Sequence, residues 1–190
     1  MIILRCFRTI FCLLVCVSPV FADHPGTVDL NPQQATPGLR LKLHELSGDA
    51  TNKRYSLQAI GFPSRIFFTL FTKSFGASFQ EVNSRLHVNE SGVMVAVRAG
   101  QPQRLEEMVL ERGPYPRGAA WDLAIASADR SFVSFARVIP HPIIARDKAC
   151  SVSLELLPGR GDRFLITGDG FSPGVDVLSE LASGGRHDHK

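Results

Sequence analysis

Near the C-terminus, three consecutive side chains have the chemistry of metal ligands. His187, Asp188 and His189 offer two imidazoles and a carboxylate, which are donors that Zn(II), Cu(II) and Ni(II) accept. Ligands this close together in an unpatterned segment do not preorganise a tetrahedral site, so the simpler expectation is a solvated tail. His187 and His189 remain the candidate metal site of the chain.

A nucleophile with its base is harder to find. Cys150 and His141 are the one cysteine and histidine that lie close in sequence, but a proline-rich connection separates them and nothing aligns the two side chains. The glycines of residues 168–174 are not expected to lead into a helix, so they offer no phosphate loop. We therefore expect no catalytic residue and no cofactor.

Three other groups have both a functional and a structural interpretation. Arg160-Gly161-Asp162 is an RGD tripeptide, yet the same residues suit the β-turn of a hairpin. Asn89-Glu90-Ser91 is a formal glycosylation sequon and also a good turn. Several phenylalanines could form an exposed ligand platform, although core packing is the simpler expectation. They are Phe67, Phe68, Phe71, Phe75 and Phe79.

The N-terminus has the three parts of a secretory signal peptide. Arg5 and Arg8 precede the apolar stretch 9–17, and Val20 and Ala22 form the small pair that a signal peptidase accepts. We expect cleavage after Ala22 and export to the periplasm or the medium. A membrane anchor is the alternative, but a span needs about 20 apolar residues. No later segment is apolar enough to cross a membrane.

Removal of residues 1–22 changes the charge and the cysteine count. The formal charge of +3 loses two arginines and becomes +1, which gives no electrostatic footprint for nucleic acid. Only Cys150 remains, so no internal disulfide can form. We expect Cys150 to be a small buried hydrophobic residue, with a reactive thiol or an intermolecular disulfide as the alternative.

Alternating apolar and polar residues dominate the rest of the chain and predict an all-β, antiparallel fold. Turn-forming residues separate the alternating stretches at the spacing of a β-sandwich. Residues 103–112 could be a short helix or a strand. The alternating stretches are 39–46, 92–98, 120–127, 131–138 and 150–157.

One pattern occurs twice: RYSLQAIGFPSRIFF at 54–68 and RFLITGDGFSPGVDV at 163–177. Each copy follows an alternating stretch and a polar turn. The glycine of each Gly-Phe pair should adopt a positive φ at the end of a strand, and the phenylalanine should fold back into the core. The pairs are Gly61-Phe62 and Gly170-Phe171, and the second leads into a tight turn at Pro173-Gly174.

The stretch ITGDGFSPGVDV resembles the corner between the second and third strands of bacterial immunoglobulin-like domains of the IPT/TIG type. In such domains the Gly-Phe pair marks the fold and is not catalytic, which is what the resemblance implies here. The match is strong at 163–177 and weaker at 54–68.

From these features we expect an immunoglobulin-like β-sandwich, built as two related modules at 25–98 and 104–182. The stretch 98–103 would link them, and residues 183–190 would form a disordered tail. One continuous sandwich over 28–182 is the alternative.

The function expected from this organisation is that of an exported, non-enzymatic protein. It would bind an envelope protein or a glycan, or act as a structural component of the cell envelope. The alternative is a periplasmic metal-handling protein that uses the His-Asp-His tail. A hydrolase assembled from scattered loop residues is a third hypothesis, which no motif favours.

Overall fold

The computed structural model describes residues 27–98, 100–159, 163–172, 174, 180–183 and 186–189. Every strand pair among named strands is antiparallel, and the only helical segments in these ranges are two three-residue 3-10 helices. The expectation of an all-β, antiparallel fold is therefore confirmed. The expected signal peptide, residues 1–22, lies outside the described residues.

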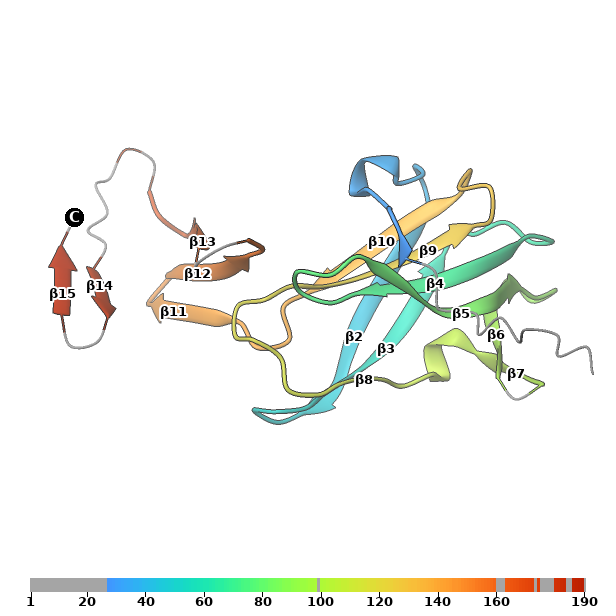
Figure 1. The fold of residues 1–190 in the computed structure, drawn as a ribbon, viewed down its shortest axis with the longest axis horizontal. Coiled ribbons are helices and arrows are strands. Elements are labelled where there is room, and N and C mark those ends of the chain that lie inside the picture. Colours follow the sequence, from blue (N-terminus) through green and yellow to red (C-terminus); the bar gives the residue numbers. More distant parts are fainter. Residues whose placement is uncertain are drawn as a thin grey trace, which may run out of the picture.

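The largest sheet, sheet A, has seven strands, and Figure 1 shows it as the broad layer on the right. The short strand β1 (Thr27–Val28) pairs with β5. The order of the others is β10 (Val133–Val138), β9 (Trp121–Ser127), β4 (Phe67–Lys73), β5 (Phe79–Val88), β6 (Met94–Arg98) and β7 (Gln101–Arg104).

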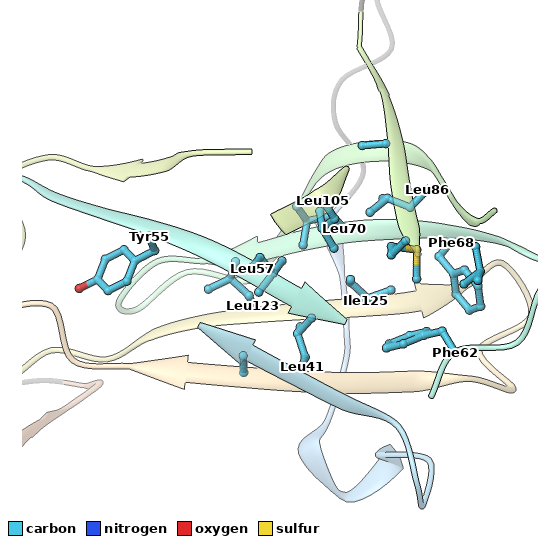
Figure 2. Close-up of a cluster of buried hydrophobic side chains, with 14 of the residues drawn as sticks. Leu41, Tyr55, Leu57, Phe62, Phe68, Leu70, Leu86, Leu105, Leu123 and Ile125 are labelled. Carbon is cyan, nitrogen blue, oxygen red and sulfur yellow. The ribbon is translucent and has the colours of Figure 1, made fainter. Parts of the chain in front are cut away.

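Sheet B covers one face of sheet A. It consists of β2 (Arg40–Gly48), β3 (Lys53–Ile60) and β8 (Leu110–Arg112). Because successive side chains point to opposite faces of a strand, alternate residues of β2 and β3 point toward sheet A. Figure 2 shows Leu41 and Leu57 close to Leu123 and Ile125 of β9, and the Tyr55 ring packs with that of Trp121 on the same strand. Each such side chain contributes about 1.5–3 kcal/mol when fully buried.

The opposite face of sheet A has a smaller cluster of its own. Ala124 and Ala126 of β9 pack there with Phe71 and Val133, under Leu30 of the N-terminal segment. That segment continues into the 3-10 helix η1 (Pro32–Gln34), which Asn31 caps. Strand β9 is therefore buried on both faces, whereas the alternation of its residues predicted that only one face would be buried.

The strand pairing runs across the stretch expected to link two modules. Residues 98 and 101–103 belong to paired strands, because β6 pairs with β7. Strands β4 and β9, which belong to different expected modules, pair directly over six residue pairs, from Phe68–Ser127 to Lys73–Asp122. One sheet thus contains strands from both sides of the expected boundary. Residues 103–112 form a short 3-10 helix, η2 (Leu105–Glu107), followed by β8.

A third sheet, sheet C, lies beyond the end of this two-layer body (Figure 1). Its order is β11 (Ile143–Asp147), β12 (Cys150–Leu157) and β13 (Arg163–Asp169). None of the side chains of its three strands is buried, whereas β3 has two buried residues and β9 has six.

Gly118 joins sheet C to the sandwich. Its N–H donates to the carbonyl of His141 (2.8 Å), and its carbonyl accepts from the N–H of Leu156 (2.9 Å). Ala119 forms a parallel bridge with Leu156. The φ of Gly118 is +77°, and a Cβ there would lie 3.1 Å from the carbonyl oxygen of Leu154. A larger residue would disturb this junction.

Two further strands lie near the end of the chain. Strands β14 (Glu180–Ser183) and β15 (Arg186–His189) pair antiparallel, in a segment that overlaps the residues 183–190 expected to form a disordered tail. In the sequence, Gly184-Gly185 separates the two strands, and Gly-Gly is a known signal for a two-residue hairpin loop. Backbone pairing needs no apolar pattern, so the polar sequence of this segment did not reveal it.

In the part of the chain that the structure describes, no helix has the length and apolar character needed to cross a membrane.

Candidate functional site

A pocket of about 350 Å³ opens on the outer face of sheet A, where β12 of sheet C meets it. We call it the Phe79 pocket. Its volume lies at the lower end of the range typical of small-ligand sites. It is lined by Pro32, Lys73, Ser74, Phe75, Gly76, Phe79, Ala120, Asp122, Phe135, Ala136, Arg137, Leu156 and Pro158.

Three strands bring the apolar wall together. Phe79 begins β5, and Phe135 lies on β10, three strands away in the sheet. Their rings pack at a centroid distance of 6.0 Å and a tilt of 58°. The ammonium group of Lys73, at the end of β4, lies 5.5 Å from the centre of the Phe79 ring. A cation over an aromatic face is attracted to it, so this lysine is positioned at the pocket.

Arg137 forms a charged network at the same pocket. Its Nε lies 3.4 Å from a carboxylate oxygen of Asp122 on the neighbouring strand, and its Nη2 contacts Glu155 of β12. The guanidinium group therefore links sheet A to sheet C. Arg137 contacts two carboxylates, and Lys73, which forms no ion pair in the described part of the chain, brings the formal charge of these four groups to zero.

An aromatic and cationic cluster supports the loop that follows Lys73. Arg112 lies over the ring of Tyr115, with its Cζ 4.1 Å from the ring centre, and donates to Ser74 Oγ (3.0 Å). The Tyr115 hydroxyl donates to the carbonyl of Ala120 (2.7 Å) and accepts from the N–H of Phe75 (2.6 Å). Burial is the largest influence on the Tyr115 hydroxyl and raises its pKa. Ser74, Phe75 and Ala120 are thus held in place at the pocket wall.

A second hollow, of about 950 Å³, lies beside the first Gly-Phe corner. Phe67 is 68% exposed there and meets His87 edge-on at 5.7 Å. Arg65 has a φ of +66°, which is a strained conformation for a residue with a side chain. The Asn89 side-chain oxygen is already occupied by the N–H groups of its own turn. This hollow has one exposed ring, whereas aromatic side chains from three segments converge at the Phe79 pocket.

The predicted phenylalanine platform is therefore divided between different surroundings. Phe67 is exposed, as that hypothesis required. Phe68, Phe71 and Phe79 are buried, as core packing required, and Phe75 lines the Phe79 pocket.

The two Gly-Phe corners share a backbone arrangement. Gly61 follows β3 with a φ of +84°, and Gly170 follows β13 with a φ of +78°. A Cβ on Gly61 would lie 2.6 Å from the carbonyl oxygen of Gly38, just before the paired strand β2. A Cβ on Gly170 would collide with the carbonyl of Ala149, just before β12. The repeat is therefore a hairpin that ends in a glycine corner.

The two phenylalanines differ, which corrects a prediction. Phe62 is 8% exposed and packs in the core, whereas Phe171 is 37% exposed. The physical reason is that sheet A covers β2 and β3, while the described residues place no second sheet over β12 and β13. Gly174 has a φ of +77°, as a tight turn requires, and Pro173 lies outside the described residues.

The groups considered for catalysis are not assembled in the described part of the chain. The Cys150 thiol is half-buried and donates to the carbonyl of Gly170 at 3.2 Å. His141 Nε2 is buried without a hydrogen-bond partner there. Residues 170–174 read Gly-x-Ser-x-Gly, which corrects the expectation that the sequence contains no such pattern. A nucleophile elbow places that serine between a strand and a helix. Ser172 follows β13, but no side-chain hydrogen bond of Ser172 occurs among the described residues.

The structure tests neither the metal-site hypothesis nor the RGD hypothesis, because the side chains concerned lie outside the described residues. The backbone of His187 pairs with Ala182, and that of His189 with Glu180, but their side chains lie outside the described set. Within that set, no three His, Cys, Asp or Glu side chains come together as metal ligands. Residues 160–162 are also outside it.

Sequence reasoning missed Lys73, Phe135 and Arg137. Alternation in β4 does place Phe71 and Lys73 on the face opposite to Phe68 and Leu70, so a basic residue on an aromatic face was visible. The convergence of that face with β10 and β12 depends on long-range pairing, which alternation does not encode.

Comparison of the chain with protein-family models, with curated proteins and with solved structures gave no match.

Proposed function

We propose that this chain is an exported, non-enzymatic binding protein of the cell envelope, and that the Phe79 pocket is its ligand site. The pocket carries the proposal because it combines an apolar wall with a positioned cation. The N-terminal signal pattern supports export. The residues that line the pocket include no histidine and no cysteine, which supports binding as its role.

We infer that the ligand has an apolar body and one anionic group. The rings of Phe75, Phe79 and Phe135 suit an aliphatic or aromatic body. In the described part of the chain Arg137 contacts both Asp122 and Glu155, whereas Lys73 forms no ion pair and is the cation open to a ligand. A carboxylate is the simplest partner for it. Such a group could belong to a small molecule or to a segment of an envelope protein.

The strand order supports an immunoglobulin-like sandwich for the two packed sheets. In such domains one sheet contains the first, second and fifth strands, and the other contains the last two strands beside the third. Sheet B has β2, β3 and β8 in that arrangement, and sheet A has β10-β9-β4-β5. The chain crosses from one sheet to the other at the Gly61-Phe62 corner, as in the IPT/TIG resemblance. We therefore propose one sandwich over 40–138, with sheet C as an additional unit.

Fluorescence titration with anilinonaphthalene sulfonate tests the site, because this probe has an aromatic body and a single anion. We expect Lys73→Met to weaken its binding about fivefold, since a charge-assisted contact contributes about 1 kcal/mol. Lys42→Met is the matched control. It removes the same charge from an exposed strand position in sheet B, and should leave binding unchanged.

Two results would contradict the proposal. Equal weakening by the two lysine variants would mean that only net charge matters. Loss of probe binding in Ile166→Lys, a variant of sheet C, would place the probe on that sheet instead. Octanoate and a carboxyl-terminal peptide of aliphatic residues, used as competitors, distinguish a small-molecule ligand from a protein segment.

A further inference from the structure

Sheet C has one face made almost entirely of apolar side chains. In an antiparallel sheet, directly paired residues lie on the same face. Ile143 pairs with Leu154, which pairs with Ile166, and Leu156 pairs with Phe164. Val152, two residues from Leu154, completes the set. We call these six residues the sheet C face.

This face is partly covered where it adjoins the sandwich, because Ile143 lies beside Gly118 and Leu156 lines the Phe79 pocket, and it is open along β13 in the described part of the chain. Phe164 is 40% exposed and Ile166 is 55% exposed. The ring of Phe171 lies on the same face, 3.0 Å from where a Cβ of Gly168 would be. The opposite face is mixed in character. Along β13 it carries the exposed Leu165 together with the polar residues Arg163, Thr167 and Asp169.

The internal repeat shows what covers the equivalent face in the other copy. When the two copies are aligned, Phe164, Ile166 and Phe171 match Tyr55, Leu57 and Phe62. In the first copy these three are 1%, 0% and 8% exposed, because sheet A packs over them. The same hairpin and the same corner thus occur once under a second sheet and once without one.

We propose that the sheet C face of one molecule packs against the sheet C face of a second copy, which makes a symmetric dimer. A two-fold arrangement uses the same patch on both partners, and an apolar face complements itself. The two sheets would lie about 10 Å apart, as in any sandwich. Phe164, Ile166 and Phe171 would then receive the cover that Tyr55, Leu57 and Phe62 have from sheet A. This inference does not rest on the proposed function, although Leu156 lies on this face and also lines the Phe79 pocket.

The area of the sheet C face determines how tightly two copies of the protein should associate. Three strands of about seven residues cover roughly 350 Å² of flat area, given the usual strand spacing and rise. Stable complexes bury about 800 Å² of accessible surface per partner. The dimer should therefore be weak, with dissociation in the micromolar range, and should depend strongly on concentration.

Sedimentation equilibrium of the purified protein, from about 1 µM to about 500 µM, tests the proposal. We expect the weight-average mass to rise toward twice the monomer mass. Ile166→Lys should raise the dissociation constant at least about tenfold, because it buries a charge in the apolar interface. Leu165→Lys is the control: it is the next residue on the same strand, is 50% exposed, and lies on the other face. It should leave the dissociation constant within about twofold.

Trp121 shows whether the sandwich of each variant is folded. It is the one tryptophan in the chain, is 4% exposed, and lies in the sandwich rather than in sheet C. Its fluorescence should be the same in all three proteins. A protein that stays monomeric over the whole range would overturn the proposal. So would association that survives Ile166→Lys, since pairing along an open strand edge would not need this face.

Discussion

The ring of Phe62 meets the ring of Phe68 edge-on, with the centroids 5.2 Å apart and the planes at 89°. This contact places the first corner of the repeat in the core between sheets A and B (Figure 2). The second corner has the same backbone turn but an exposed phenylalanine. A pair of substitutions can therefore separate the contribution of the turn from that of the core.

Phe62→Ala should lower the free energy of unfolding by about 3–5 kcal/mol, which is typical for removing a buried phenylalanine. Phe171→Ala should lower it by less than about 1 kcal/mol for the monomer, because that ring is partly in solvent. Urea unfolding followed by Trp121 fluorescence measures both. Equal losses would mean that Phe171 is covered in the folded monomer.

Gly61→Ala tests the corner itself. Gly76 has a similar positive φ of +73°, but a Cβ there would have no neighbour within 4 Å. Gly76→Ala should therefore cost only the backbone strain, about 1 kcal/mol. Gly61→Ala adds a collision with the carbonyl of Gly38 and should cost at least about 1 kcal/mol more. If thermal unfolding gives both variants the same stability, the corner tolerates a side chain and its glycine needs another explanation.

The two tyrosines of the chain should respond differently to loss of the hydroxyl. The Tyr55 hydroxyl is buried with no hydrogen-bond partner among the described residues, so Tyr55→Phe should be neutral or slightly stabilising. Tyr115→Phe leaves the N–H of Phe75 without its acceptor and should destabilise by about 1–3 kcal/mol. Chemical unfolding at pH 7 compares them. A large loss in Tyr55→Phe would reveal a partner for that hydroxyl.

Burial, with a smaller contribution from Glu45, raises the pKa of Tyr55 to about 12. The folded state holds the hydroxyl proton of Tyr55 more tightly than the unfolded state does. The stabilisation that results is fully present below about pH 10. It is lost as the pH rises toward 12. Absorbance titration should show both tyrosines ionising above pH 10, with Tyr55 about two pH units late, and Tyr55→Phe should remove that late step. A single transition near pH 10 in the folded protein would contradict this.

The carboxyl group of Asp49 gives the folding stability the opposite dependence on pH. The N–H of Asn52, followed by the N–H and hydroxyl of Thr51, lowers its pKa to about 2. The folded state therefore favours the ionised carboxylate, and the stability it supplies is present above about pH 4 and is lost as the pH falls toward 2. Wild type should be more stable than Asp49→Asn at pH 6, and the difference should narrow across that range. A difference that does not change with pH would show that ionisation of Asp49 has no part in it.

Local patterns predicted the strands well, because alternation records which face of a strand is buried. The stretches 39–46 and 150–157 predicted β2 and β12, and the Gly-Phe pairs predicted both corners. Alternation does not record what lies above a face. The same pattern therefore predicted burial for Phe171 as for Phe62, and only one of them is buried.

The candidate site was less predictable for the same reason. Lys73, Phe135 and Leu156 come from strands far apart in the sequence, and they meet because β9 pairs with both β4 and β10 and β12 bridges to Ala119. The stretch expected as a linker was misjudged for a different reason, because residues 98 and 101–103 belong to the local pairing of β6 with β7. A polar, glycine-containing stretch suits a linker and a turn equally well.

The hydrogen bonds on both sides of Gly118 determine how sheet C meets other molecules. They fasten β12 and the chain before β11 to the start of β9, and Pro140 in that connection is fully buried. A surface that is held in one orientation loses little conformational freedom when it binds, whereas a surface on a slack tether must first be ordered. Sheet C should therefore lose little free energy to the ordering of its own backbone on binding. Most of the free energy gained by burying its small apolar area then contributes to affinity.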